Sequence, residues 1–398
     1  TVVGWWKNGY PKYFGKTPNA PSFIGIGITV NGEKIDLAKV KFSDFELSLD
    51  MHQGLLSRSF IYEGKDVKVK FEFERFLHIV QKEAALIKVK ATVLKGEAKI
   101  DFDSTLDGTV VKEDSNYDER FWIPLGENKD TKTIQVKTKP NPYEVPQFTV
   151  LLQESLRHNG ELIQTEASTK EAKLSEKFSV ELSEGQSYEL EKDVIVITSR
   201  DVEEKDQASV AEDLMNKLQS KSFEENLADH TAEWQKRWDM SDVEISGDAA
   251  AQQGIRFNIA QLFMTYYGED ERLNVGPKGF TGEKYGGATY WDTEAYIVPM
   301  YLGITDPSVT KALLQYRHNQ LPGAYHNAKE QGLPGALFPM VTFNGIECHN
   351  EWEITFEEIH RNADIPHAIA MYTEYTGDDS YVKRMPLMTL LYSPSFVT

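Results

Sequence analysis

The spacing of apolar residues changes once along this chain of 398 residues, close to residue 200. Before that point apolar and charged residues alternate, as in the run Val67, Val69, Phe71 and Phe73, which is the period of a half-buried strand. After it, apolar residues recur every three to four positions, the period of an amphipathic helix. The pattern therefore predicts a β domain followed by helical structure.

The β part reads as a series of strands joined by turns. Asn31-Gly32 separates two short apolar runs and is a hairpin signal, because glycine accepts the positive φ that such turns need. Residues 194–197 are all β-branched and predict a buried strand. Many strands with few helix signals favour an antiparallel β-sandwich, which we assign to residues 1–201.

The helical part divides into a linker and a larger domain. Val210, Leu214 and Leu218 form one stripe within a charged segment, so residues 202–248 are predicted to be a helical linker. Residues 249–398 alternate helical patterns with long aromatic and polar loops. Such a pattern favours a helical toroid with a site at one mouth.

Three signals predict where individual helices begin and end. Asp306-Pro307 is a helix start, because the aspartate can accept from free backbone donors and proline fits the first helical position. Asp364 is predicted to cap a later helix that stops near Gly377.

Charge and cysteine usage exclude several classes of partner. The formal net charge is −19, which disfavours nucleic acid and anionic membranes. No apolar run is long enough to span a bilayer. The single cysteine, Cys348, excludes an internal disulfide framework and fits a reducing compartment, so a cytoplasmic location is expected.

A tryptophan beside an aspartate, Trp291-Asp292, is the first candidate site. An indole can cover the flat C–H face of a sugar ring, and a carboxylate can accept from two adjacent hydroxyls. The alternative is structural, with Trp291 in the core and Asp292 as a helix cap.

A second candidate segment follows sixty residues later. It is rich in acids, amides and aromatics and would suit a hydroxyl-rich ligand; its candidate residues are His349, Asn350, Glu351, Trp352 and Glu353. The alternative is a solvated acidic loop. The spacing of its histidines and glutamates matches no zinc pattern, so no metal is expected.

These two segments resemble a known family. The run from Gly282 to Tyr296, with its Trp-Asp-Thr-Glu core, looks like the signature of glycoside hydrolase family 65. The segment His349–Glu358 and the preceding Met340-Val341-Thr342 resemble the maltose-acting phosphorylases within that family. Residues 3–10 and 50–58 are similar to the same subgroup.

The resemblance implies a β-sandwich, here expected to lack its first strands, a helical linker and an (α/α)₆ barrel, of which residues 249–398 would be the first part. It also implies an inverting phosphorolysis of maltose, or a related α-glucoside, to β-glucose 1-phosphate and glucose. Inorganic phosphate would be the co-substrate, with no organic cofactor, while one glutamic acid protonates the leaving oxygen. The family is usually a homodimer, which is carried over as an expectation.

By motif match, Trp291 and Asp292 would hold the glucose at the cleaved side, and the segment 349–357 would shape the acceptor subsite. The family's general acid and phosphate-holding residues have no counterpart in these 398 residues, and the likeness fades after Arg384. No catalytic residue is therefore assigned, and the isolated chain is expected to show negligible turnover.

Two alternatives remain open. One is an α-glucoside hydrolase that uses water and two carboxylates from the set Asp292, Glu294, Glu351 and Glu353. The other is a non-catalytic carbohydrate-binding remnant, which would bind maltose without converting it.

Overall fold

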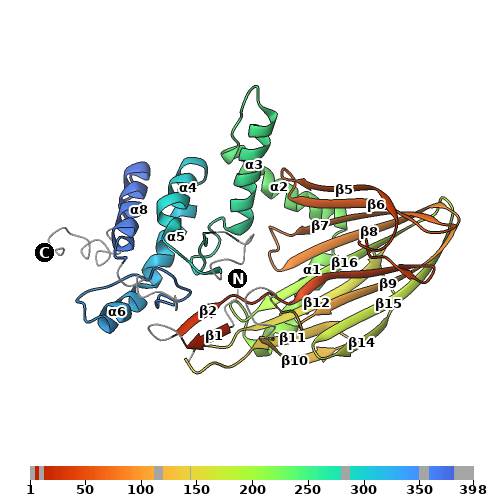
Figure 1. Cartoon of the computed structure of the whole chain (residues 1–398), viewed down its shortest axis with the longest axis horizontal. Coiled ribbons are helices and arrows are strands. Elements are labelled where there is room, and N and C mark those ends of the chain that lie inside the picture. Colours follow the sequence, from red (N-terminus) through yellow and green to blue (C-terminus); the bar gives the residue numbers. More distant parts are fainter. Residues whose placement is uncertain are drawn as a thin grey trace. The chain divides into compact units, whose positions relative to one another are not determined.

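The structure is a computed structural model that describes residues 5–8, 13–111, 120–143, 145–277, 279, 287–348 and 358–380. The chain forms two compact units (Figure 1). The sandwich unit comprises Asn19–Pro140 and Pro146–Lys236. The helical unit comprises Thr1–Pro18, Asn141–Val145 and Arg237–Thr398.

The sandwich unit contains two antiparallel sheets, which confirms the predicted fold of this part. The large sheet has the order β10 (Trp122–Asn128), β11 (Thr133–Thr138), β12 (Thr149–His158), β16 (Ser187–Thr198), β8 (Ala84–Lys95), β7 (Lys68–Leu77), β6 (Leu55–Glu63) and β5 (Phe42–Asp50), with β13 (Glu161–Leu162) paired to β12. The small sheet has the order β14 (Glu166–Lys170), β15 (Lys173–Ser183), β9 (Glu97–Asp107), β3 (Ser22–Val30) and β4 (Glu33–Lys34). The predicted hairpin at Asn31-Gly32 joins β3 to β4, with φ of 48° and 85°.

The core between the sheets follows from the alternation seen in the sequence. Val69 and Phe71 of the large sheet and Ile100 and Phe102 of the small sheet are all buried in one apolar cluster. Full burial of such a side chain stabilises the fold by about 1.5–3 kcal/mol. Lys68 and other residues between the buried positions on β7 face outward, as the period of two requires.

The helices after the sandwich contribute to its core. A 3₁₀ turn η1 (Glu204–Asp206) leads into α1 (Gln207–Gln219), which packs against β16 and β12 and is followed by α2 (Phe223–Ser241) (Figure 1). Met215 and Phe223 lie in the same apolar cluster as Leu86 and Ile195. A helix whose apolar stripe covers a sheet shares that sheet's core.

The structure therefore divides the chain differently from the predicted boundaries of 1–201, 202–248 and 249–398. The segment predicted as a linker starts as part of the sandwich unit, and the division falls inside α2, between Lys236 and Arg237. Residues 1–18, which we assigned to the sandwich, belong to the helical unit. They contribute β1 (Trp5–Asn8) and β2 (Tyr13–Lys16), an antiparallel pair.

A buried ion pair within the large sheet, between β12 and β16, is hydrogen-bonded to β9 of the small sheet. The Lys192 ammonium lies 2.7 Å from the Glu154 carboxylate, and both side chains have an exposed fraction of 0%. Lys192 also donates to the carbonyl of Thr105 at 3.0 Å, and the Ser104 hydroxyl donates to Glu154 at 2.8 Å. Burial raises the pKa of Glu154 and lowers that of Lys192. The opposite charge of each partner acts against these two pKa shifts.

The helical unit contains α3 (Ala249–Thr265), a π turn η3 (Thr293–Ile297), α4 (Val298–Ile304), α5 (Pro307–Asn319), α6 (Leu321–Glu330) and α8 (Arg361–Thr376). Helix α5 packs against α4, α6 and α8. The described helices form an open assembly rather than a closed ring. Across the described residues, no helix combines the length and the apolar character needed to cross a bilayer.

The helix signals were mostly correct. Asp306 caps α5 by accepting from the Ser308 amide at 2.9 Å, and Gly377 ends α8 in the left-handed region with φ of 71°. The assignment of Asp364 as a cap was wrong, because α8 begins three residues earlier, at Arg361. The first turn forms there because Arg361 is itself fixed by contacts with a neighbouring loop, described below.

Replacing Lys192 by methionine should destabilise the protein by about 3–5 kcal/mol, because Glu154 would stay buried without its partner. The double variant Lys192→Met with Glu154→Leu should recover much of that loss. Urea unfolding measures both. Lys39→Gln, which breaks an ion pair whose side chains are 80% and 41% exposed, is the matched control and should change stability by less than about 1 kcal/mol. Equal losses in the single variant and the control would refute the structural role of the buried pair.

Candidate functional site

Trp291 and Asp292 lie where a long loop enters the π turn η3. The carbonyl of Trp291 accepts from the amides of Glu294 at 3.0 Å and Ala295 at 3.2 Å, which starts the turn. Both side chains are partly exposed, and Asp292 makes no capping hydrogen bond although it precedes the turn. The alternative of a core tryptophan and a capping aspartate therefore does not describe these residues.

An aromatic cluster surrounds the indole. The ring centre of Trp291 lies 4.9 Å from that of His360, edge to face at 85°, and 6.1 Å from that of Tyr296. His360 is exposed and Tyr296 is 65% exposed. The cluster thus combines an apolar surface with access to solvent, which is what stacking on a pyranose ring requires.

A buried ion pair fixes the Trp-Asp dipeptide from both sides. Arg317 of α5 donates to Glu294 through Nε at 2.7 Å and through Nη2 at 2.8 Å, and both side chains are 1% exposed. The same Nη2 donates to the carbonyl of Tyr290 at 2.9 Å. Since Tyr290 precedes the dipeptide and Glu294 follows it, Arg317 acts as a positioning residue.

Hydrogen bonds join this segment to the second candidate loop. Thr289 and Thr342 exchange backbone hydrogen bonds of 2.9 and 3.1 Å. The Thr289 hydroxyl also lies 2.9 Å from that of Tyr316 on α5. Thr293, within the π turn, donates its hydroxyl to the carbonyl of Val275 at 2.8 Å. Two segments that are fifty residues apart in the sequence are therefore held side by side.

Helix α6 holds the second loop through one amide side chain. Asn327 donates to the carbonyls of Leu337 at 3.1 Å and Gly345 at 3.0 Å, and it accepts from the Glu347 amide at 3.0 Å. Glu347 is fully buried and accepts from the amide of Met340 at 2.6 Å. The loop is consequently anchored at several points of its backbone.

Helix α8 holds the other side of that loop. Asn362 accepts from the amide of Phe338 at 3.0 Å and donates to the carbonyl of Ala336 at 2.9 Å. Arg361 donates to the carbonyl of Phe338 at 2.5 Å, and its guanidinium lies 4.0 Å from the Glu347 carboxylate. These contacts explain why α8 starts at Arg361.

The predicted residues His349, Asn350, Glu351, Trp352 and Glu353 lie outside the described residues. The chain is described up to Cys348, whose amide donates to the carbonyl of Val341 at 3.0 Å. Its thiol is buried, and burial raises the pKa of that thiol above the usual value. Among the described residues no group of histidine, cysteine and carboxylate side chains gathers as a metal site.

Sequence reasoning missed the residues that support the site. Glu347, Arg361 and Asn362 stand in or beside the segment that attracted notice, but nothing in the sequence indicated that Glu347 and Arg361 are buried or that Asn362 holds the loop. Arg317 carried no signal at all, because an arginine in an amphipathic helix pattern is normally read as solvent-facing. Only Glu294, two residues after Asp292, could have suggested that a basic side chain such as Arg317 pairs with it.

Replacing Arg317 by methionine should destabilise the helical unit by about 3–5 kcal/mol, since Glu294 would remain buried and uncompensated. It should also weaken sugar binding, because the dipeptide loses its support. Unfolding by urea and calorimetric titration measure the two effects. Arg256→Gln, at a partly exposed pair with Asp242, serves as the control and should leave both nearly unchanged. If Arg317→Met retains full stability, the ion pair does not position the dipeptide.

Comparison with known proteins places both units in one family. The model of the glycosyl hydrolase family 65 N-terminal domain matches residues 1–237, and that of the family's central catalytic domain matches residues 256–396. The chain is 49% identical over 98% of its length to a maltose phosphorylase of Bacillus subtilis, of which it covers 51%. It is 32% identical over 90% of its length to an alpha,alpha-trehalose phosphorylase of Thermoanaerobacter brockii, covering 47% of that protein.

A solved structure shares the fold. It is a candidate kojibiose phosphorylase from the human microbiome, matched with a TM-score of 0.85 and 25% identity over 95% of this chain and 50% of the other. The chain thus spans about half the length of the curated relatives it matches.

Proposed function

We propose that the protein, which belongs to glycosyl hydrolase family 65, cleaves maltose by phosphorolysis. The products would be β-glucose 1-phosphate and glucose. The support is the 49% identity to a maltose phosphorylase, together with a tryptophan and a carboxylate placed side by side and open to solvent. Among the described residues, the partly exposed Trp291-Asp292 pair is the observation that carries the proposal.

The proposed roles follow from the chemistry of the two side chains. The Trp291 indole would cover the apolar face of the non-reducing glucose. Asp292 would accept from two adjacent hydroxyls, through charge-assisted bonds that fix the ring for attack at its anomeric carbon. Phosphate would attack from the opposite face while a glutamic acid protonates the leaving oxygen, so one protein carboxyl group suffices. No described residue is assigned to that acid. The segment 349–357 would shape the acceptor subsite.

The hydrolytic alternative loses one of its candidate carboxylates. Glu294 is 2% exposed and bound at both oxygens by Arg317, so its carboxylate is not available to a sugar. Asp292 remains available, as a binding group in the phosphorylase proposal and as a catalytic group in the hydrolase one.

Asp292→Asn should weaken the binding of maltose by about 10- to 100-fold, since it removes a charged acceptor of two hydroxyls. Glu358→Gln is the matched control, because it also neutralises a carboxylate at the edge of the candidate site, and its effect should stay within about twofold. Titration calorimetry measures both variants. Equal losses would contradict the role given to Asp292.

Phosphate dependence separates the three functions. A phosphorylase should release glucose from maltose only when phosphate is present, with one glucose 1-phosphate formed for each glucose. Equal rates with and without phosphate would favour the hydrolase. Because the chain without the family's general acid is expected to show negligible turnover, the assay needs a protein that carries this acid. Binding of maltose by that protein with no turnover under either condition would favour the non-catalytic alternative.

We further propose a cytoplasmic homodimer that needs no organic cofactor or metal. The support is the family resemblance and the single, buried cysteine. Light scattering would give the mass of the assembly. Dialysis against a chelator should leave the rate of maltose cleavage unchanged, and a loss that zinc or magnesium restores would contradict the absence of a metal.

A further inference from the structure

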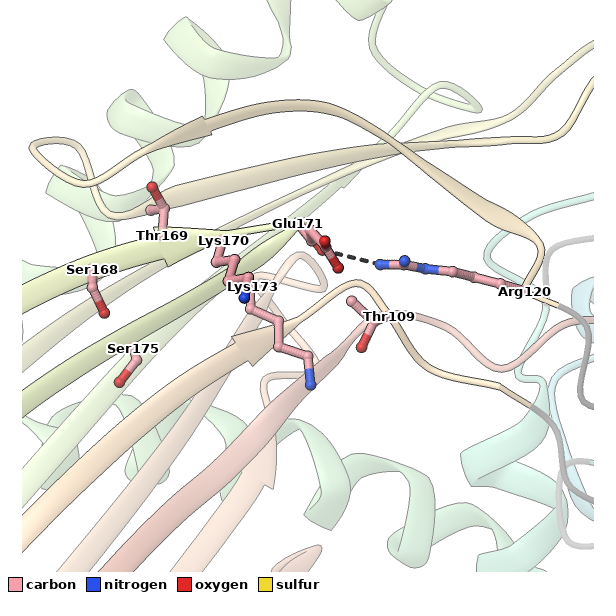
Figure 2. Close-up of a pocket in the computed structure, with 8 residues that line it drawn as sticks. All are labelled: Thr109, Arg120, Ser168, Thr169, Lys170, Glu171, Lys173 and Ser175. Carbon is pink, nitrogen blue, oxygen red and sulfur yellow. Dashed lines mark hydrogen bonds between the residues drawn. The ribbon is translucent and has the colours of Figure 1, made fainter.

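A pocket of about 510 Å³, lined by polar and charged residues, lies on the sandwich unit at the hairpin between β14 and β15 (Figure 2). Nothing in the proposed function uses it. Its lining combines three basic side chains and the carboxylate of Glu171 with hydroxyl groups, on a chain of net charge −19. A chain of that charge repels anions in general, so a local group of cations needs an explanation.

Two lysines face one another across the hairpin. Lys170 on β14 and Lys173 on β15 are directly opposite, and so are Ser168 and Ser175, two positions further along. With a strand period of two, all four side chains lie on one face. Like charges directly opposite destabilise a strand pair. Lys173 pairs with Asp107 at 2.8 Å, whereas Lys170 has no ion-pair partner among the described residues.

The turn that joins these lysines is strained. Glu171 and Ala172 both adopt the left-handed region, with φ of 52° and 64°, although neither is glycine. Contacts from outside the hairpin hold them there. Arg120 donates to the carbonyl of Glu171 at 3.0 Å, and the amide of Gly108 donates to the carbonyl of Ala172 at 2.8 Å. The amide of Ala172 donates to the Glu127 carboxylate.

Arg120 brings a third cation to the pocket. Figure 2 shows its side chain reaching from its own loop toward Glu171. Its Nε is buried and has no hydrogen-bond partner within the described structure. Arg120, Lys170 and Lys173 thus line one pocket, and a phosphate can accept charge-assisted hydrogen bonds from several such cations at once.

We propose that this pocket binds a phosphorylated sugar. The phosphate group lies between Lys170, Lys173 and Arg120, where it relieves the repulsion across the hairpin. The hydroxyl of Ser168 hydrogen-bonds to the sugar. The hydroxyl of Ser175 already donates to Asp103 at 2.5 Å, so it can only accept a hydrogen bond from the sugar. The volume exceeds what bare phosphate needs and lies in the range of small-ligand sites. The site is independent of the proposed function and goes beyond it.

Titration calorimetry with glucose 1-phosphate, inorganic phosphate and glucose tests the site. The Asp292→Asn variant is the background, so that sugar binding in the helical unit contributes little. Glucose 1-phosphate should bind with saturation, about tenfold tighter than inorganic phosphate, and glucose should not bind detectably. Equal affinities for the two phosphates would overturn the sugar part of the proposal. No saturable binding of either would overturn all of it.

Variants of the lysines locate the binding. In that background Lys170→Gln should weaken binding of glucose 1-phosphate about tenfold or more. Lys177→Gln is the matched control, because Lys177 also lies on β15, is 61% exposed and does not line the pocket. Equal loss in both variants would show that binding is a general charge effect and would refute the site.

Thermal unfolding gives a readout that a merely structural lysine would not move in the same way. Lys170→Gln should raise Tm in the absence of ligand, because the repulsion across the hairpin disappears. In the Asp292→Asn background it should also abolish the rise in Tm that glucose 1-phosphate produces. A lower Tm without ligand, or a ligand-induced rise that persists, would contradict the proposal.

Discussion

One buried guanidinium–carboxylate pair determines the geometry of the candidate site. Arg317 and Glu294 have almost no exposure, so both have lost their hydration, and a buried pair is stabilising only where further hydrogen bonds compensate. Here the compensation comes from bidentate geometry and from the carbonyl of Tyr290. The pair therefore couples α5 to the backbone on both sides of Trp291-Asp292. It keeps an aromatic ring and a carboxylate at the surface in a fixed relation, which a loop alone would not maintain.

The second loop is organised by the same principle with different groups. Asn327, Arg361 and Asn362 satisfy backbone carbonyls and amides that the loop itself leaves unpaired. Buried backbone groups need partners, and in a loop without regular structure only side chains can supply them. The two backbone hydrogen bonds between Thr289 and Thr342 then join both loops. A change in any of these side chains would consequently act on the candidate site without touching a ligand.

The sandwich unit shows two different uses of charge. Lys192 and Glu154 are paired within the large sheet, where they are hydrogen-bonded to β9 of the small sheet. At the β14–β15 hairpin, by contrast, two lysines are left opposite one another on a turn that is held in an unfavourable conformation. The first arrangement is complete without any ligand. The second is not, and this difference is the physical basis for assigning an anion to the hairpin pocket.

The sequence determined the fold class, because the periods of two and 3.6 report which residues are buried on a strand and on a helix. It also determined local features such as the Asn31-Gly32 turn, the Asp306 cap and the stop at Gly377, since each depends on the conformation of a few consecutive residues. Residue chemistry and the family resemblance singled out Trp291-Asp292. Tertiary structure alone decided that α1 belongs to the sandwich, that α8 starts before Asp364, and that Arg317, Asn327 and Glu347 are buried. Those outcomes depend on partners distant in the chain, and a polar residue looks the same in sequence whether water or a carbonyl satisfies it.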